Sequence, residues 1–298
     1  MVWVVVFSRL KKDFIEKFRS LIHKHREYQV FSDFVEVGAI VAHQAFYNLK
    51  MFPQDDAYKQ LEKRYMEFVP IYGREGLTTF SEMFAIVQAA LNTTKGDFLG
   101  EVYQELELNT KYKGQFFTPY HLSKMIALML LDKEGIERAI SQKGFVSIEE
   151  PACGAGGMLI AACEVVEELG YDPRQVVYFE ATDVDKTCFN MSYLQLASLG
   201  IPGFVIHGNS LNQEVWEQRP TPQLQLYLKR EELNHGSKTV LKMLSLLSLA
   251  SGEEAQKQKA EVEDVSTTET NATNEETASV PPRQLDIFLD WQSQVNQE

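Results

Sequence analysis

The alternation of strand and helix patterns between residues 145 and 207 constrains the fold of this chain more than any other feature. Short runs that are rich in β-branched and aromatic residues predict strands, and longer amphipathic runs between them predict helices. Gly200 follows the second helix, where a glycine commonly ends a helix. Strands joined by crossover helices form a parallel sheet, so the sequence predicts an α/β fold here. The predicted strands cover 145–149, 176–182 and 204–207, and the predicted helices cover 158–169 and 186–199.

Helical periodicity dominates the first 110 residues, and no chemical motif interrupts it. Thr79 and Glu82 have the spacing of a capping box, which predicts a helix from Thr79 to Leu91. Beyond this region, Thr118 is a predicted helix cap, with Pro119 at the favoured first position. The buried stripe of that helix is predicted to be Leu122, Met125, Ile126, Met129 and Leu130. Other helices are predicted at 11–26, 31–49, 55–69 and 97–108.

The charge of the chain is unevenly placed. The net charge is −13, and residues 251–298 hold 11 acidic and 3 basic side chains. A domain that binds duplex DNA by itself usually shows a basic face, and this chain has only one basic stretch, seven Lys and Arg side chains within residues 1–26. That stretch either contacts phosphates or is the solvated face of an amphipathic helix.

Targeting, disulfide and metal signals are absent from the sequence. No apolar run approaches the ~20 residues of a membrane span, and no basic segment precedes the apolar residues 2–7 as in a signal peptide. We therefore expect a cytoplasmic protein without membrane contact. Cys153, Cys163 and Cys188 form no C-x-x-C pair, which argues against a disulfide framework and against structural zinc. The histidines are scattered, so no metal site is predicted.

A glycine-rich segment joins the first predicted strand to its helix: Glu150-Pro151-Ala152-Cys153-Gly154-Ala155-Gly156-Gly157. Glycines there let the backbone approach a ligand, and the start of the helix presents N–H groups to it. Leu159 stands where the dinucleotide pattern G-x-G-x-x-G needs its third glycine. Asp183 ends the second strand, where a carboxylate can accept both ribose hydroxyls of an adenosine. The alternative is that Asp183 and Asp185 are ordinary polar residues at a strand end.

Further motifs stand in a fixed order around this segment. Asp97-Phe98-Leu99-Gly100-Glu101 and Gly114-Gln115-Phe116-Phe117-Thr118-Pro119 precede it, and Gly208-Asn209-Ser210-Leu211 follows it. The ordered set resembles the N6-adenine DNA methyltransferases of the type I restriction-modification class. The resemblance covers roughly residues 97–211 and implies a Rossmann-like methyltransferase sheet that binds S-adenosylmethionine. An RNA or small-molecule methyltransferase is disfavoured by the segment at 114–119.

The resemblance also implies the roles of individual residues. The segment at 116–119 is similar to the family loop at the methionine end of the cofactor, the glycines match the turn beneath the cofactor, and Asp183 matches the ribose acid. Asn209 stands where the family usually has an aspartate that accepts from the adenine amino group, so that bond loses its charge assistance. The expected cofactor-binding residues are Phe117, Thr118, Pro119, Glu150, Pro151, Cys153, Gly154, Gly156, Asp183 and Asn209.

The tetrapeptide that family enzymes use on the target adenine, Asn/Asp-Pro-Pro-Tyr/Phe, does not occur in the sequence. Pro281-Pro282 is preceded by Val280 and followed by Arg283, and 219–222 has no paired prolines. The family sheet continues with further strands after the third, whereas residues 224–249 predict one or two helices. Residues 223–228 alternate in polarity and could form a short fourth strand. We therefore expect a truncated methyltransferase domain without catalytic residues of its own.

Apolar residues return abruptly near the end of the chain, after residues 251–280, whose composition predicts disorder. Gln284, Leu285, Asp286, Ile287 and Phe288 resemble the peptide by which bacterial proteins bind the replicative sliding clamp. A disordered tether would let such a peptide dock without constraining the body. The alternative is a terminal helix that folds back on the body.

Four parts and two functional hypotheses follow from these patterns. The parts are a helical N-terminal region (1–110), a truncated α/β domain (111–250), a disordered acidic linker (251–282) and a terminal interaction peptide (283–298). One hypothesis is an N6-adenine DNA methyltransferase that acts on DNA through a partner subunit. The other is an inactive relative, tethered to the sliding clamp by its last residues. Whether this chain is an enzyme by itself stays open at this stage.

Overall fold

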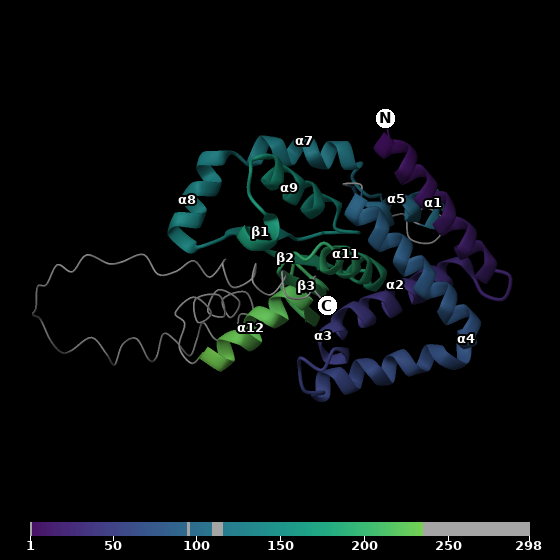
Figure 1. The fold of residues 1–298 in the computed structure, drawn as a ribbon. Helices are drawn as coiled ribbons and strands as arrows, with labels where there is room; N and C mark the ends of the chain where they lie inside the picture. Colours follow the sequence, from purple (N-terminus) through teal and green to yellow (C-terminus); the bar gives the residue numbers. More distant parts are fainter. Residues whose placement is uncertain (1, 94–95, 109–115, 235–298) are drawn as a thin grey trace, which may run out of the picture. The chain divides into compact units, whose positions relative to one another are not determined.

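The computed structural model describes residues 2–93, 96–108 and 116–234 of the chain (Figure 1). All of these residues lie within one compact unit, Met1–Val240. The predicted acidic linker (251–282) and the predicted clamp peptide (284–288) lie outside the described residues. Gly114 and Gln115 also lie outside them.

The described residues within 2–93 and 96–105 are mainly helical, as predicted. Their helices are α1 (Val2–Leu21), α2 (Glu27–His43), α3 (Ala45–Asn48), α4 (Asp56–Thr93) and α5 (Phe98–Glu105). The basic side chains of α1 partly pair with acids: Lys11 contacts Glu101 and Glu105 of α5, and Lys17 contacts Glu82 of α4. These ion pairs tie α1 to its neighbours.

Helix α4 is interrupted at Gly73, whereas the sequence predicted that a new helix begins at Thr79. Gly73 has a φ of 63°, and this left-handed residue separates two helical stretches. Thr79 does not cap a helix, because its hydroxyl donates to the Glu75 carbonyl oxygen at 3.1 Å, one turn back inside the second stretch. The capping-box prediction was therefore wrong. A Ser or Thr hydroxyl has this second option inside a helix, which the sequence spacing cannot distinguish from a cap.

Helix α7 (Tyr120–Leu130) buries the opposite set of side chains from the predicted stripe. Ser123 and Ala127 face inward, whereas Met129 and Leu130 are 78% and 76% exposed. Small side chains let α7 lie close to α9 (Gly157–Glu168), where Ala127 packs against Ala161, Ala162 and Val165. Thr118 is not the cap either, since Pro119 holds that position without a side-chain bond. Helix α8 (Lys133–Lys143), which the sequence reading missed, follows α7.

The sheet has four strands in the order β1 (Val146–Glu150), β2 (Val177–Asp183), β3 (Gly203–Asn209) and β4 (Glu214–Pro220). The first three are parallel and confirm the predicted α/β core. Between them lie α9, the short α10 (Pro173–Val176) and α11 (Lys186–Ser198). Gly200 follows α11 with a φ of 75°, as a helix-ending glycine should.

The fourth strand differs from the prediction in position and direction. β4 pairs antiparallel with β3, so the sheet is mixed. Residues 223–228 belong to α12 (Pro222–Asn234), and the prediction of a strand there was wrong. A proline at the start of a helix is well accommodated, whereas it cannot donate to a sheet ladder. The sequence did not predict β4, because its apolar residues, Val215 and Trp216, are about half exposed and show no alternation of buried and exposed positions.

A buried polar network holds β4 and α12 against the body. The Tyr193 hydroxyl donates to the Pro220 carbonyl oxygen at 2.8 Å, so its oxygen is left to accept from Nδ1 of His43 at 2.9 Å. The Gln225 amide then donates to Nε2 of His43 at 3.0 Å. Arg219 lies over the rings of Phe189 and Tyr193. This pattern fits a neutral His43, and burial together with the Arg219 charge lowers the His43 pKa to about 3.

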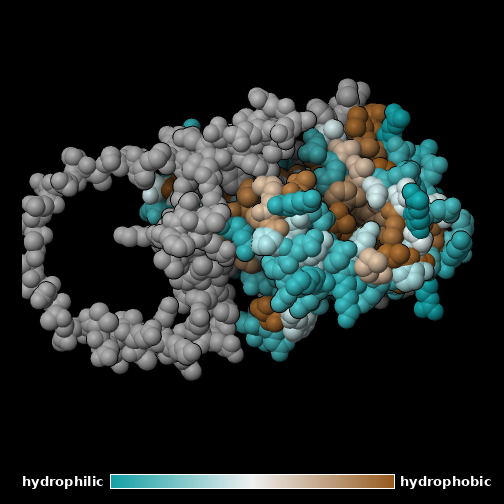
Figure 2. Space-filling model, turned by 60° about the horizontal axis from the view of Figure 1, so that its bottom comes forward, coloured by the Kyte–Doolittle hydropathy of each residue, from teal (hydrophilic) through white to brown (hydrophobic). Residues whose placement is uncertain are grey.

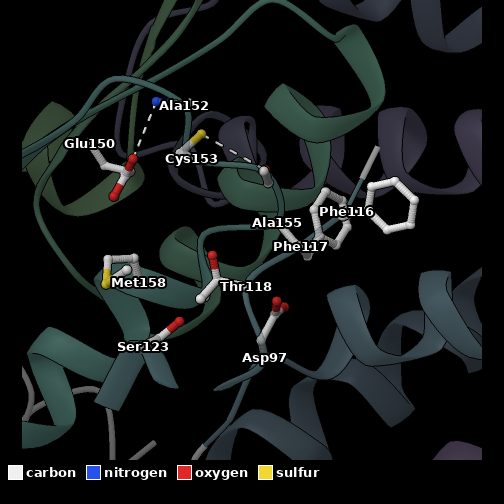
Figure 3. A pocket seen from close by; sticks show the side chains of 12 residues that line it. Asp97, Phe116, Phe117, Thr118, Ser123, Glu150, Ala152, Cys153, Ala155 and Met158 are labelled. Atoms are coloured by element: carbon white, nitrogen blue, oxygen red, sulfur yellow. Dashed lines mark hydrogen bonds between the residues drawn. The ribbon is translucent and has the colours of Figure 1, made fainter. Parts of the chain in front are cut away.

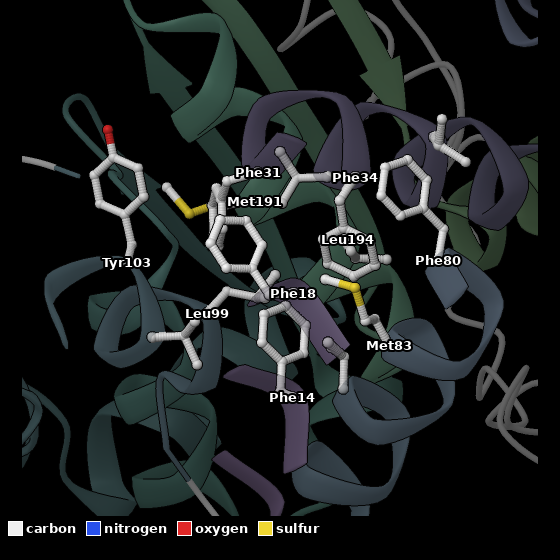
Figure 4. Packing of buried hydrophobic residues seen from close by; sticks show 14 of the residues in the cluster. Phe14, Phe18, Phe31, Phe34, Phe80, Met83, Leu99, Tyr103, Met191 and Leu194 are labelled. Atoms are coloured by element: carbon white, nitrogen blue, oxygen red, sulfur yellow. The ribbon is translucent and has the colours of Figure 1, made fainter. Parts of the chain in front are cut away.

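One hydrophobic core joins the helical region to the α/β part. Phe14, Phe18, Phe31 and Phe34 pack with Met191 and Leu194 of α11 (Figure 4). Helix α11 is buried on all sides, since its other face packs on β2 and β3. The division of the chain at residue 110 stays a prediction, and the two predicted parts share this core.

A shallow apolar groove lies between α2 and α4. Phe34, Val41, Tyr65, Leu77 and Phe84 are among the residues that line it. Figure 2 shows apolar side chains exposed between polar surfaces on one face of the molecule. Within residues 2–93, 96–108 and 116–234, no helix has the length and apolarity that crossing a membrane requires.

Candidate functional site

The glycine-rich segment forms a tight turn between β1 and α9. The Cys153 N–H donates to the Thr182 carbonyl oxygen of β2 at 2.9 Å, and the Gly156 N–H donates to the Cys153 carbonyl oxygen at 2.7 Å. Gly154 and Gly156 have φ angles of 54° and 91°, which side chains with a Cβ rarely adopt. Helix α9 therefore begins immediately after the turn, with its first N–H groups unpaired within the helix.

A small cleft of about 110 Å³, open to solvent, lies beside this turn at the carboxyl end of β1 (Figure 3). Five of the ten predicted cofactor residues line the cleft: Phe117, Thr118, Glu150, Cys153 and Gly154. The other lining residues are Asp97, Phe116, Ser123, Ala152, Ala155, Gly157 and Met158. The structure thus brings the predicted loop at 116–118 and the predicted turn together.

Phe117 forms one wall of the cleft. Its ring stacks on Tyr103 of α5, with centroids 5.5 Å apart. A Cβ on Gly154 would stand 3.0 Å from the Phe117 ring, which is closer than side chains normally pack. Phe116, by contrast, is 80% exposed. The glycine at position 154 therefore allows the aromatic loop to lie directly against the turn.

Asp183 braces the turn from the end of β2. Its carboxylate accepts from the Gly154 N–H and the Asp185 N–H, both at 2.8 Å. Burial raises the Asp183 pKa, although these backbone bonds oppose the shift. Asp185 caps α11 by accepting from the Thr187 N–H at 2.8 Å. Asp183 does not line the cleft itself, but it fixes the geometry of a residue that does.

The end of β3 closes the same edge of the sheet. Asn209 accepts from the Leu211 N–H at 3.0 Å through its side-chain oxygen, which shapes the turn after the strand. The Ser210 hydroxyl donates to the Pro151 carbonyl oxygen at 2.9 Å and so links this turn to the glycine-rich segment. Pro119, Pro151, Gly156 and Asn209, like Asp183, lie outside the cleft lining.

Cys153 is a packed residue rather than a reactive one. The side chain is buried, and burial raises the pKa of its thiol well above the ordinary value. Its sulfur lies 3.5 Å from the Ser192 hydroxyl of α11. A thiol that stays protonated is a poor nucleophile, so the buried Cys153 side chain contributes packing to the turn rather than reactivity.

Asp97 and Ser123 are two polar lining residues that the sequence did not predict as part of the site. Asp97 caps α5 by accepting from the Gly100 N–H at 2.9 Å. The fully buried Gln195 of α11 donates to the same carboxylate oxygen at 2.8 Å and to the Ala155 carbonyl oxygen at 2.7 Å, and it accepts from the Leu99 N–H at 3.0 Å. One amide therefore connects the start of α5 to the glycine turn.

Comparison with protein families identifies this part of the chain. Residues 94–226 match the family model described as N-6 DNA Methylase. These residues, which make up less than half of the chain, are similar to the N-6 DNA methylase family. The matched segment contains α5, the loop at 116–119, the glycine turn and all four strands.

A curated relative agrees with this assignment. Over 112 residues the chain is 30% identical to the type I restriction enzyme MjaIX methylase subunit of Methanocaldococcus jannaschii. The alignment takes in 36% of this chain and 18% of that subunit. The chain thus matches less than a fifth of the length of this relative.

Two solved structures are similar to parts of this chain at low TM-scores. One is a class I S-adenosylmethionine-dependent methyltransferase from Listeria monocytogenes, with 20% identity, a TM-score of 0.32, and coverage of 62% of this chain and 54% of that one. The other is the type I restriction-modification methyltransferase subunit from Streptococcus thermophilus, with 14% identity, a TM-score of 0.36, and coverage of 72% and 60%.

Proposed function

We propose that this chain binds S-adenosylmethionine in the cleft at the carboxyl end of β1, as the cofactor-binding part of an N6-adenine DNA methyltransferase. The observation that carries the proposal is the meeting of two distant segments there. Phe117 and Thr118 come from the loop before α7, and Glu150 and Gly154 come from the glycine-rich turn. Both segments lie within the residues that match the N-6 DNA methylase family.

The residues of the cleft suit the chemistry of this cofactor, which supplies a methyl group on a positively charged sulfur. Asp97 and Glu150 line the cleft, and no Lys, Arg or His is among its described lining residues. Acidic side chains without nearby basic ones favour a cationic ligand. The close contact between Gly154 and the Phe117 ring leaves an aromatic wall on one side.

The adenosine end of the cofactor is assigned to Asp183 and Asn209. Each oxygen of the Asp183 carboxylate accepts one backbone N–H, which leaves each a second lone pair for a ribose hydroxyl. Asn209 uses its side-chain oxygen on the Leu211 N–H, so a bond from the adenine amine would have to share that oxygen. We therefore expect the adenine to be held less strongly than the ribose.

Calorimetric titration with S-adenosylmethionine tests the proposal, with a variant that fills the cleft. Ala152 is exposed and lines the cleft, so Ala152→Trp should block the ligand without disturbing the core. Gln142→Trp on α8 is the matched control, because its side chain is exposed and away from the cleft. We expect binding by the wild type and the control, and none by Ala152→Trp. Absence of wild-type binding at millimolar ligand would refute the proposal.

Transfer of the methyl group to DNA requires residues beyond those in the cleft. The transfer moves a methyl from the sulfonium to adenine N6, releases S-adenosylhomocysteine and removes one proton from the amine. A flipped adenine needs hydrogen-bond acceptors and a stacking ring, and the sequence lacks the tetrapeptide that supplies them. We propose that another polypeptide supplies this tetrapeptide and the contacts to DNA. Transfer of radiolabelled methyl to adenine only in the presence of such a subunit would support this.

A second proposal concerns the residues at 284–288, which resemble a sliding-clamp peptide. The abrupt return of apolar side chains after an acidic stretch is the observation that favours it. Under this proposal the chain is a non-catalytic relative that is tethered to the clamp. Phe288→Ala should abolish capture of the chain by purified clamp, whereas unchanged capture would rule out this role for the peptide.

A further inference from the structure

The carboxylate of Asp97 uses its two oxygens unequally. Oδ1 accepts both the Gly100 N–H at 2.9 Å and the Gln195 amide at 2.8 Å. Oδ2 accepts no hydrogen bond from a described residue, and Asp97 lines the cleft. The cap of α5 and the bridge to the glycine turn therefore need only one of the two oxygens, which leaves the other for a ligand.

The hydroxyl of Ser123 is the second unsatisfied group in this cleft. Ser123 is 1% exposed, and its oxygen has no hydrogen-bond partner among the described residues. In Figure 3 the Ser123 hydroxyl and the Asp97 carboxylate lie on either side of Thr118 in the cleft. A buried hydroxyl without a partner is costly unless a ligand or water satisfies it.

The charge of Asp97 is also uncompensated. No ion pair joins Asp97 to a basic side chain within the described residues, and burial raises its pKa to about 6. A buried carboxylate is stable as an anion only when a positive or donating group faces it. A ligand with a compact positive charge and several N–H donors would satisfy both Asp97 and Ser123.

We propose that Oδ2 of Asp97 and the hydroxyl of Ser123 form the subsite for the primary ammonium group of the cofactor's methionine moiety. This inference rests on the proposed function, because it assigns one end of the same ligand. It makes Asp97 a direct ligand contact as well as the cap of α5. Selectivity then follows, since an adenosine compound that lacks the α-amino group of the methionine moiety gains nothing from Asp97.

Asp97→Asn is the deciding variant, because the amide oxygen can keep the bonds from Gly100 and Gln195 while an NH₂ group replaces Oδ2. Asp132→Asn is the matched control. Asp132 caps α8 in the same way, accepting from the Gly135 N–H at 2.7 Å, but it lies outside the cleft. The full-length chain and both variants are titrated with S-adenosylmethionine and with 5′-methylthioadenosine, which lacks the amino acid moiety. Thermal melting verifies that each variant folds.

We expect Asp97→Asn to weaken S-adenosylmethionine binding by at least about tenfold, as for loss of a bond to a charged group. Its affinity for 5′-methylthioadenosine and both affinities of Asp132→Asn should stay unchanged. Ser123→Ala should weaken S-adenosylmethionine binding by a smaller factor. Equal losses for both ligands in Asp97→Asn would show a purely structural cap and overturn the inference, as would wild-type affinity for S-adenosylmethionine. If the wild type binds neither ligand, the proposed function itself fails.

Discussion

Replacing Gln195 by methionine tests whether its buried amide holds the site together. Methionine has a similar volume, so the packing of α11 should be kept while three hydrogen bonds are lost. Asp97 retains its bond from Gly100, but the Leu99 N–H and the Ala155 carbonyl oxygen lose their partner. An orphaned buried polar group costs about 1–3 kcal/mol, so two of them predict a loss of roughly 2–6 kcal/mol in the free energy of unfolding.

Urea denaturation followed by circular dichroism measures this loss directly. At about 2–4 °C per kcal/mol for a folded unit of this size, the same change lowers the melting temperature by roughly 4–24 °C. Gln88→Met is the control, because Gln88 is half-buried and makes one bond, to Ser198. A loss below about 1 kcal/mol for Gln195→Met, or a loss equal to that of Gln88→Met, would refute the reasoning. The amide would then contribute packing alone.

Three further predictions concern the turn and two buried ionisable groups. Gly154→Ala should cost about 1–2 kcal/mol in stability and should also weaken S-adenosylmethionine binding by displacing Phe117. The control is Gly144→Ala, because Gly144 also has a positive φ, 86°, but a Cβ there has no neighbour within 4 Å. This control should leave S-adenosylmethionine binding, measured by calorimetry, unchanged. His43 is neutral in the fold, with a pKa of about 3, whereas in the unfolded chain it is protonated below about pH 6.5. The urea concentration at the unfolding midpoint should therefore fall as the pH drops below about 6.5. In His43→Gln this dependence on pH should be weaker. Asp97 has a raised pKa of about 6 in the fold, so the folded protein holds this proton more tightly than the unfolded chain does. As the pH rises from about 4 to about 6, the wild type should therefore lose stability relative to Asp97→Asn by about 1.4 kcal/mol per pH unit. A wild type whose stability follows that of the variant across this range would contradict the assignment.

The parts of the fold that the sequence predicted are those with strong local periodicity. β1, β2, β3, α9 and α11 lie within a few residues of the predicted ranges. The failures have identifiable causes. The apolar side chains of α7 point outward because its partner α9 presents small residues that admit only Ser123 and Ala127. β4 escaped notice because an edge strand with exposed apolar residues has no buried alternation to detect.

The sequence predicted the site residues that belong to continuous motifs. Gly154 and Phe117 belong to sequence motifs that lie close to each other in the cleft. No sequence motif contains Ser123, because its place in the cleft depends on the packing of α7 against α9. The position of Asp97, three residues before Gly100, is that of a helix cap, so its capping role could be predicted from the sequence. That pattern does not reveal that the second carboxylate oxygen faces a cleft.

The free side of β1 has a consequence for how a catalytic loop can be delivered. β1 pairs with β2 along one side, and no strand among the described residues pairs with the other. An open strand edge can receive another strand through backbone hydrogen bonds. β1 ends at Glu150, which lines the cleft, so a strand added parallel to β1 would also end there. A loop that follows a strand added in this parallel direction would therefore arrive beside the cleft.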